Sequence, residues 1–255
     1  AGDCDDTTAL LCSLFEAAGI ATAVVTTPDH VLMAFDTGEP GANRWLYSEA
    51  GFATFVQGGK LWLPVETTVL SEGFFAALEA ANRRIDQAGG PGGAGFVTTE
   101  RAGQLYPTIP VPQTQLNIPL PPAEDIRNLH QISTTEVRDS IYLSGVQRLE
   151  NAIQGVEGTA RAAQLSRLGA LHNRFGRLER AERALRDALT AAPDSLLPRV
   201  NLATLKIQAD RPAARSVPAP GAELVGGVDG TVTASDRIRA PAPVAAFAAV
   251  TAAAL

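Results

Sequence analysis

The sequence predicts an α+β domain followed by an α-helical region. Three observations lead to this fold class: a helical pattern opens the chain, β-branched runs follow it, and helical spacing returns on both sides of a glycine- and proline-rich stretch. We therefore divide the chain into an α+β domain at 1–88, a linker at 89–132, a helical region at 133–209 and an Ala/Pro-rich, disordered tail at 210–255.

The first helix is expected from about Asp5 to Ala18. Its apolar residues recur at the i, i+3, i+4 spacing of one helix face, and they are Leu10, Leu11, Leu14, Phe15 and Ala18. Asp5 or Asp6 is expected to be the N-cap, and Gly19 stands where a glycine commonly ends a helix. Cys4 therefore lies at or just before a helix N-terminus, where free N–H groups and the helix dipole favour an anion such as a thiolate.

Four short strands and a second helix complete the predicted α+β domain. The strands are expected where β-branched and aromatic residues gather between turn residues, at 21–27, 30–36, 45–47 and 60–66. Pro64 in the last of them indicates an edge position or a bulge. Residues 73–87 return to helical spacing, so this helix closes a unit of helices and antiparallel sheet.

The region from 133 to 209 is predicted to be helical. Ser133-Thr134-Thr135-Glu136 has the form of a capping box, so a helix is expected from there to about 154. Residues 162–195 place small and large side chains in the order Leu168-Gly169, His172, Gly176, Ala181, Leu185, Ala188 and Pro193. This order resembles a 34-residue tetratricopeptide unit, with His172 in place of the usual aromatic residue. A second unit begins at Leu196 and loses the pattern after Gln208, so the helices are expected to pack on the preceding helix or on the first domain.

Composition and chain ends exclude several classes of function. A net charge of −6 over 255 residues, with no strongly basic stretch, argues against nucleic acid as a partner. The apolar run at 243–255 is too short to span a bilayer, so no membrane span is expected. Cys4 and Cys12 lie about 12 Å apart if they share a helix, so free thiols are expected. No signal peptide is visible, and because residue 1 falls beside a candidate nucleophile we expect the domain to be truncated at its N-terminus.

Cys4, His30 and Glu66 are the candidate catalytic residues. A cysteine nucleophile requires a base within hydrogen-bond reach, and that base requires a third group to fix its tautomer. A helix start and two adjacent strands can present these side chains at one end of a sheet. A metal site built from the same three residues and Cys12 has no recognisable ligand pairing, so no metal or other cofactor is expected.

Other residues suit these roles less well. Asp36 shares a strand face with His30 but lies about 20 Å along the strand, and Asp29 would point to the opposite face. Cys12 falls within the helical run and is expected in the core. Trp62 either walls the site or packs in the core.

Three segments together resemble the bacterial transglutaminase-like superfamily: Gly2-Asp3-Cys4-Asp5-Asp6 with its helix, Asp29-His30-Val31, and Leu61-Trp62-Leu63-Pro64-Val65-Glu66-Thr67-Thr68. The resemblance covers about residues 1–80 and implies a papain-like α+β core with a Cys, His, Asp/Glu triad in that chain order. It implies that Cys4 is the nucleophile, His30 the general base and Glu66 the residue that orients His30. Glu66 stands where many relatives have aspartate, which lengthens the arm by one methylene.

The resemblance implies a thiol hydrolase or peptidase that acts on amide bonds through an acyl-thioester on Cys4, with a peptide or protein as substrate. Relatives are often exported, and on that ground alone a periplasmic or exported location is expected. The alternative is a protein-interaction module, in which the tetratricopeptide-like helices bind a peptide or partner protein and the first domain is a catalytically idle scaffold. A groove lined by outward-facing side chains of residues 162–208 would support that alternative.

Overall fold

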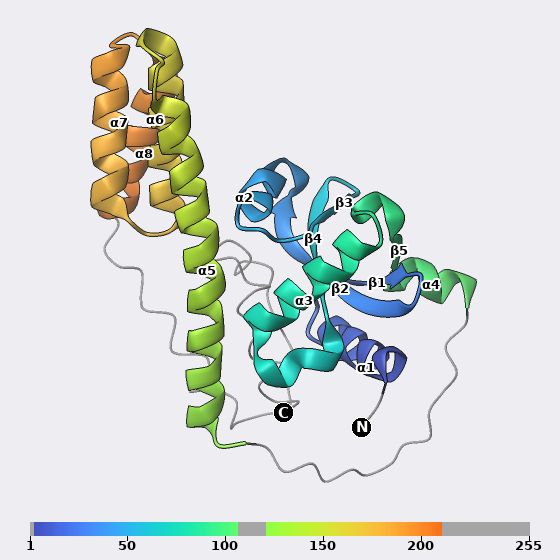
Figure 1. Ribbon diagram of the computed structural model, residues 1–255. Helices are drawn as coiled ribbons and strands as arrows, with labels where there is room; N and C mark the ends of the chain where they lie inside the picture. The colour runs from blue at the N-terminus through green and yellow to red at the C-terminus, as the bar shows by residue number, and fades with distance from the viewer. Residues whose placement is uncertain (1–2, 107–120, 211–255) are drawn as a thin grey trace. The chain divides into compact units, whose positions relative to one another are not determined.

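The computed structural model describes residues 3–106 and 121–210, with side chains described up to residue 207. Two compact units divide the chain between Asp139 and Ser140, inside the long helix α5 (Ala123–Ile153). The first unit holds an antiparallel sheet with helices, and the described part of the second is helical (Figure 1). The α+β class predicted from the sequence is confirmed.

The sheet of the first unit has five strands: β1 (Thr22–Thr27), β2 (His30–Pro40), β3 (Phe55–Gln57), β4 (Lys60–Val65) and β5 (Gly95–Thr98). Their order is β3-β4-β2-β1-β5, and every neighbouring pair is antiparallel. Gly58 and Gly59 join β3 to β4 with φ of 60° and 75°, which a two-residue hairpin turn requires. Pro64 lies on an internal strand, but β3 pairs with β4 only from Lys60 to Trp62, so Pro64 has a strand neighbour on one side alone.

Helical segments connect and cover the strands of this unit: α1 (Cys4–Ala17), η1 (Gly41–Asn43), α2 (Arg44–Glu49), η2 (Thr67–Glu72), α3 (Phe74–Gln87), η3 (Pro91–Gly93) and α4 (Thr99–Leu105). The ring of Phe15 on α1 lies 5.8 Å from that of Phe35 on β2. Ile85 of α3 joins a buried cluster with Leu32, which points to the other face of the same strand. Since both faces are covered, residues 32–37 of β2 are all buried.

The ends of α1 follow local capping chemistry. Asp3 is the N-cap, and its Oδ1 accepts hydrogen bonds from the N–H groups of Asp5 at 3.2 Å and Asp6 at 3.3 Å. The expectation that Asp5 or Asp6 caps this helix was therefore wrong, because the N-cap lies two residues before Asp5 and the helix begins at Cys4. Gly19 has a φ of 78°, and the N–H of the next residue donates to the carbonyl of Phe15 at 2.9 Å, which is the closing bond of a Schellman motif.

Two expectations for the first unit differ from the structure. Residues 45–47, expected as a strand, lie in α2, where the consecutive residues Leu46 and Tyr47 are both buried. Residues 91–105, expected in the linker, form η3, β5 and α4. β5 belongs to the sheet because Val97 pairs with Val24 of β1, and Phe96 packs against Phe55 at 5.1 Å. Residues 107–120 of the expected linker lie outside the described residues.

The second unit combines the end of α5 with α6 (Gly158–Arg174), α7 (Leu178–Ala191) and α8 (Leu196–Asp210). A Cβ at Gly169 of α6 would lie 2.6 Å from Leu185 Cγ on α7, so these two helices cross closely there. Asn201 Nδ2 donates to Ser166 Oγ at 3.0 Å and ties α8 to α6. The predicted helices are confirmed, whereas their assignment as tetratricopeptide units stays a prediction.

The start of α5 differs from the predicted helix start at Ser133. The helix begins at Ala123, so the predicted capping box lies inside it. Thr134 Oγ1 donates to the carbonyl of His130 at 2.7 Å, one turn back, as a hydroxyl inside a helix commonly does. The expected tail lies outside the described residues from 211 onward.

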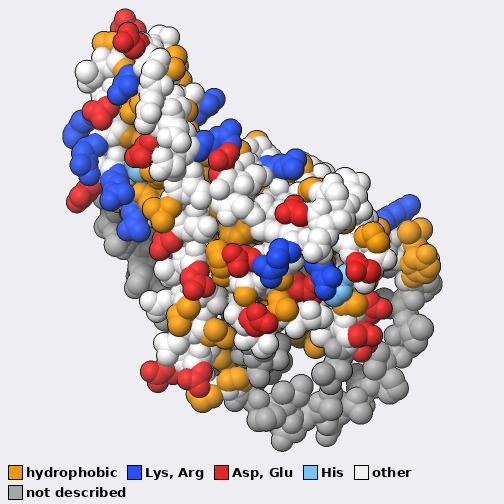
Figure 2. All heavy atoms as spheres, in the orientation of Figure 1, with side chains coloured by type: hydrophobic (Ala, Val, Ile, Leu, Met, Phe, Trp, Pro, Cys, Tyr) orange, Lys and Arg blue, Asp and Glu red, His pale blue; other side chains and the backbone are white. Residues whose placement is uncertain are grey.

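None of the described helices is long and apolar enough to cross a membrane. On the face drawn in Figure 2, acidic and basic side chains lie interspersed over the described surface. Such mixed charge is typical of a solvated surface.

Candidate active site

His30 and Glu66 meet at one end of two neighbouring strands. His30 is the first residue of β2, and Glu66 directly follows β4. The register pairs Met33 with Val65, which brings the start of β2 beside the end of β4. His30 Nε2 lies 2.6 Å from Glu66 Oε2, and the two side chains are only 11% and 3% exposed. The contact is an ion-pair distance, although neither atom meets the angular criteria of a hydrogen bond.

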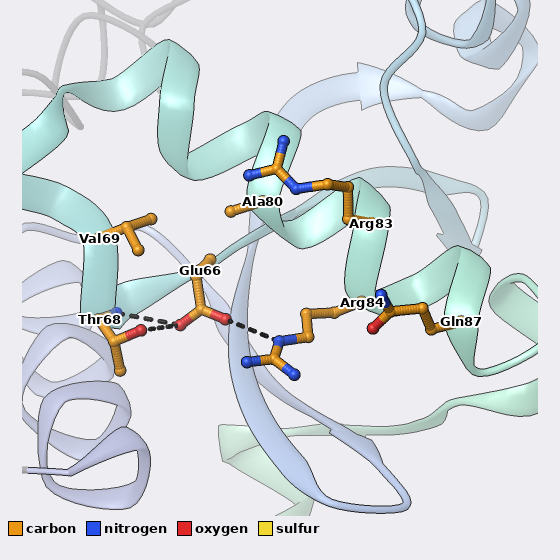
Figure 3. Close-up of a pocket in the computed structure, with 7 residues that line it drawn as sticks. All are labelled: Glu66, Thr68, Val69, Ala80, Arg83, Arg84 and Gln87. Carbon is orange, nitrogen blue, oxygen red and sulfur yellow. Dashed lines mark hydrogen bonds and ion pairs between the residues drawn. The ribbon is translucent and has the colours of Figure 1, made fainter.

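The carboxylate of Glu66 is held from several directions. Its Oε1 accepts hydrogen bonds from the N–H of Thr68 at 3.0 Å and from the hydroxyl of the same residue at 2.7 Å. Its Oε2, which faces His30, also lies 3.7 Å from Arg84 Nε on α3 (Figure 3). The backbone N–H of Glu66 donates to the carbonyl of Ala77 at 3.1 Å. A carboxylate fixed in this way can fix the orientation of the imidazole beside it.

Cys4 occupies the first position of α1 and is partly buried. Its thiol donates to Asp5 Oδ1 at 3.4 Å. The same end of α1 is bonded to the residue after Glu66, because the hydroxyl of Thr67 lies 2.8 Å from that of Thr7 and 3.2 Å from that of Thr8. Cys4 makes no hydrogen bond to His30 in the part of the chain that the structure describes.

The free nitrogen of His30 is the one that a cysteine nucleophile would need. Because Nε2 faces Glu66, Nδ1 is left for a second partner, and no partner occupies it among the residues that the structure describes. A rotation about the Cα–Cβ bond of Cys4 takes the thiol away from Asp5. Catalytic hydrogen bonds are often long or poorly aligned before substrate binds.

The rival residues have other roles. Asp36 accepts a hydrogen bond from Lys60 Nζ at 2.7 Å, and the side chain of Asp29 is 78% exposed, 4.0 Å from Arg84. Cys12 is buried, and burial above all raises the pKa of its thiol to about 11, with Glu16 adding to that rise and a hydrogen bond with Thr22 opposing it. Both cysteines are free, as expected.

Trp62 packs in the core, with its ring 5.4 Å from that of Phe96 in an edge-to-face arrangement. Within the described ranges, no three His, Cys, Asp or Glu side chains gather as a set that could hold a metal ion.

Sequence reasoning missed two contributors to this site. Arg84 lies on α3 and contacts Glu66 through the packing of this helix on the end of β4. No local sequence pattern indicates such a contact. Thr67 joins the Glu66 segment to α1 across about sixty residues of sequence. The Glu66-Thr67-Thr68 segment was the available signal, since it carries two hydroxyls directly after the carboxylate.

A pocket with a volume of about 350 Å³ opens beside Glu66. Residues of η2 and α3 line it together with Glu66 itself: Thr68, Val69, Ala80, Arg83, Arg84 and Gln87 (Figure 3). The candidate catalytic carboxylate therefore forms part of the wall of a cavity large enough for a side chain of a substrate.

Comparison of the chain with protein-family models, with curated proteins and with solved structures finds no match. The function is therefore inferred from the residues and from their geometry. His30 and Glu66 form an imidazole–carboxylate pair with little exposure, and Cys4 begins a helix whose Thr7 hydroxyl is hydrogen-bonded to Thr67.

Proposed function

We propose that this protein is a thiol hydrolase of the transglutaminase-like kind, which cleaves amide bonds in a peptide or protein. The observation that carries the proposal is the 2.6 Å contact between His30 Nε2 and Glu66 Oε2. That contact leaves Nδ1 of the same ring for a thiol, and Cys4 stands at the N-terminus of a helix bonded to the Glu66 segment. Nucleophile, base and orienting group are the parts that such a reaction requires.

In the proposed reaction His30 Nδ1 takes the proton of the Cys4 thiol, and sulfur attacks the amide carbonyl carbon. The tetrahedral intermediate collapses, the C–N bond breaks, and His30 gives its proton to the departing amine. The resulting acyl-thioester is attacked by water, which loses a proton to His30 while the C–S bond breaks. The proton on His30 returns to the thiolate, and the acid product leaves. Glu66 holds the ring in the required tautomer and stabilises the imidazolium that forms in each half of the cycle.

A peptide mixture with blocked amino termini tests the proposal, with new amino termini read by mass spectrometry. We expect the full chain to cleave peptides and Cys4→Ser to cleave them at no more than background level. Cys12→Ala should cleave like the unmodified protein, because Cys12 lies in the core. Hydroxylamine added to the reaction should trap the acyl group as a hydroxamate. Cleavage that persists in Cys4→Ser, or a full chain that forms neither new termini nor hydroxamates, would contradict the proposal.

One observation favours the interaction module as a second candidate. α8 exposes a set of apolar side chains that are each at least half accessible: Leu196, Leu197, Val200 and Ile207. A fluorescent amphipathic helical peptide is a suitable probe, with binding measured by anisotropy. Val200→Glu should abolish binding if α8 provides the surface. Lys206→Gln is the control, because it lowers the net charge by the same one unit at an exposed position about 120° around the helix from Val200. Equal binding by both variants would exclude this surface.

A further inference from the structure

The pocket beside Glu66 carries a positive charge without a counter-ion. Its lining side chains include two arginines and one carboxylate, so they sum to one positive charge in a chain whose net charge is −6. Arg84 is partly neutralised, because its Nε lies 3.7 Å from Glu66 Oε2 and its Nη1 lies 4.0 Å from Asp29. Arg83 has no ion-pair or hydrogen-bond partner among the described residues. The guanidinium of Arg83 is therefore free to bind an anion.

The pocket also has the shape and donors for an acidic side chain. In the view of Figure 3 the side chains of Arg83 and Arg84 extend from α3 to the same side, with Ala80 and Glu66 between them. The apolar groups of Val69 and Ala80 can contact methylenes, and the Gln87 amide adds a neutral donor. Arginine presents a planar fork of N–H groups that matches a carboxylate with two parallel hydrogen bonds.

We propose that this pocket binds a carboxylate of the substrate, with Arg83 as its principal partner. The inference deepens the proposed function and rests on it. Glu66 belongs to both features, because its Oε2 contacts His30 and its side chain lines the pocket. The substrate is thus an acidic peptide, and the acidic group is either a side chain or a carboxyl terminus.

Binding to the full-length Cys4→Ala protein tests this inference without any need for catalysis. Three peptide probes separate the sources of the carboxylate: acetyl-Gly-Gly-Glu-Gly-amide, its Gln counterpart, and acetyl-Gly-Gly-Gly-Gly with a free carboxyl terminus. Affinities are measured by NMR titration of the ¹⁵N-labelled arginine Nε groups. We expect one of the two carboxylate probes to bind about tenfold more tightly than the neutral peptide, as a charge-assisted fork predicts, and this probe identifies the source.

Variants then assign the effect to the pocket. Arg83→Gln, on an exposed position of α3, should remove the preference for the carboxylate probe. Arg101→Gln removes the same charge from α4, where Arg101 Nη1 bonds only to Gln104 among the described partners, and it should retain the preference. Equal affinity for carboxylate and neutral probes, or equal preference in the Arg83→Gln and Arg101→Gln proteins, overturns the inference. Cleavage at Cys4 without a carboxylate preference defeats this inference alone, and carboxylate binding without cleavage defeats the proposed function alone.

Discussion

Two histidines in this chain, His30 partly buried and His172 buried, have opposite surroundings. His30 contacts the carboxylate of Glu66 at 2.6 Å through Nε2, and its other nitrogen has no partner among the described residues. His172, on α6, has its Nδ1 3.1 Å from the hydroxyl of Tyr142, to which Arg180 also donates at 3.2 Å. The imidazole of His30 faces a negative charge through one nitrogen and keeps the other nitrogen free of partners in the described part of the chain. The imidazole of His172 faces a shared hydroxyl and positive charges.

The difference separates the chemical role proposed for His30 from a structural one. Burial lowers the pKa of His172 below its ordinary value of 6.5, and the nearby charges of Arg180 and Arg183 lower it further. His172 therefore stays neutral and serves as a packing and hydrogen-bonding group. In the proposed reaction, the carboxylate beside His30 instead stabilises the imidazolium that forms. What surrounds a histidine, more than its burial, indicates whether it moves protons.

The largest effect expected from this comparison follows from Glu66→Gln. The amide keeps the shape of the side chain but removes the charge that orients His30, so kcat/KM for peptide cleavage should fall by about 10³- to 10⁴-fold. Steady-state kinetics on a peptide identified in the cleavage assay measure the loss. Asp29→Asn is the matched control, because Asp29 is exposed and should change the rate less than about threefold. Similar kinetics in both variants would remove Glu66 from the proposed triad.

A smaller effect is expected at the second histidine from Tyr142→Phe. This change deletes the hydroxyl shared by His172 and Arg180, and it should lower the free energy of unfolding of the helical unit by about 1 kcal/mol. Urea unfolding followed by circular dichroism measures the change. Tyr106→Phe removes a hydroxyl from a residue that is 75% exposed, and it should leave stability within about 0.5 kcal/mol. The interpretation of His172 as a structural residue fails if Tyr142→Phe lowers peptide cleavage as strongly as Glu66→Gln.

The pH dependence of stability gives the smallest effect. Because the pKa of His172 is lower in the folded chain than in the unfolded one, the unfolded chain binds more protons between the two values. The contribution of His172 to stability is therefore complete above about pH 6.5 and declines as the pH falls below it. Thermal unfolding at pH 7.5 and at pH 5.5 should show a lower midpoint at the acidic pH. His172→Gln should show a smaller difference between the two conditions, and an unchanged difference would contradict this assignment.

Periodicity predicted the parts of the fold that local sequence determines, whereas both helix N-termini predicted from capping residues were wrong. The apolar stripe of α1, the glycine at its end and the β-branched runs at β1 and β2 all occur close to their expected places. The contact between His30 and Glu66 was expected because a histidine that opens one strand and a glutamate that closes another meet when the two strands are antiparallel neighbours.

Long-range contacts explain what local patterns did not predict. β5 is short and follows a glycine-rich stretch, so only its pairing with β1 makes it a strand. The residues at 45–47 favour a strand by type, but the burial of two consecutive side chains suits a helix. Arg84 approaches Glu66 through tertiary packing alone, and the pocket that it lines has no signature in the sequence.

The rate of Cys4 alkylation by iodoacetamide tests the central claim most directly. Mass spectrometry of the native protein follows both thiols at once, and Cys12 is an internal reference because its pKa of about 11 and its burial should leave it unmodified until denaturant is added. If His30 activates Cys4, the thiol reacts faster than a free cysteine near pH 7, and His30→Ala lowers the rate to that of a free cysteine. A Cys4 rate equal to that of a free cysteine, or one that His30→Ala leaves unchanged, would contradict the account.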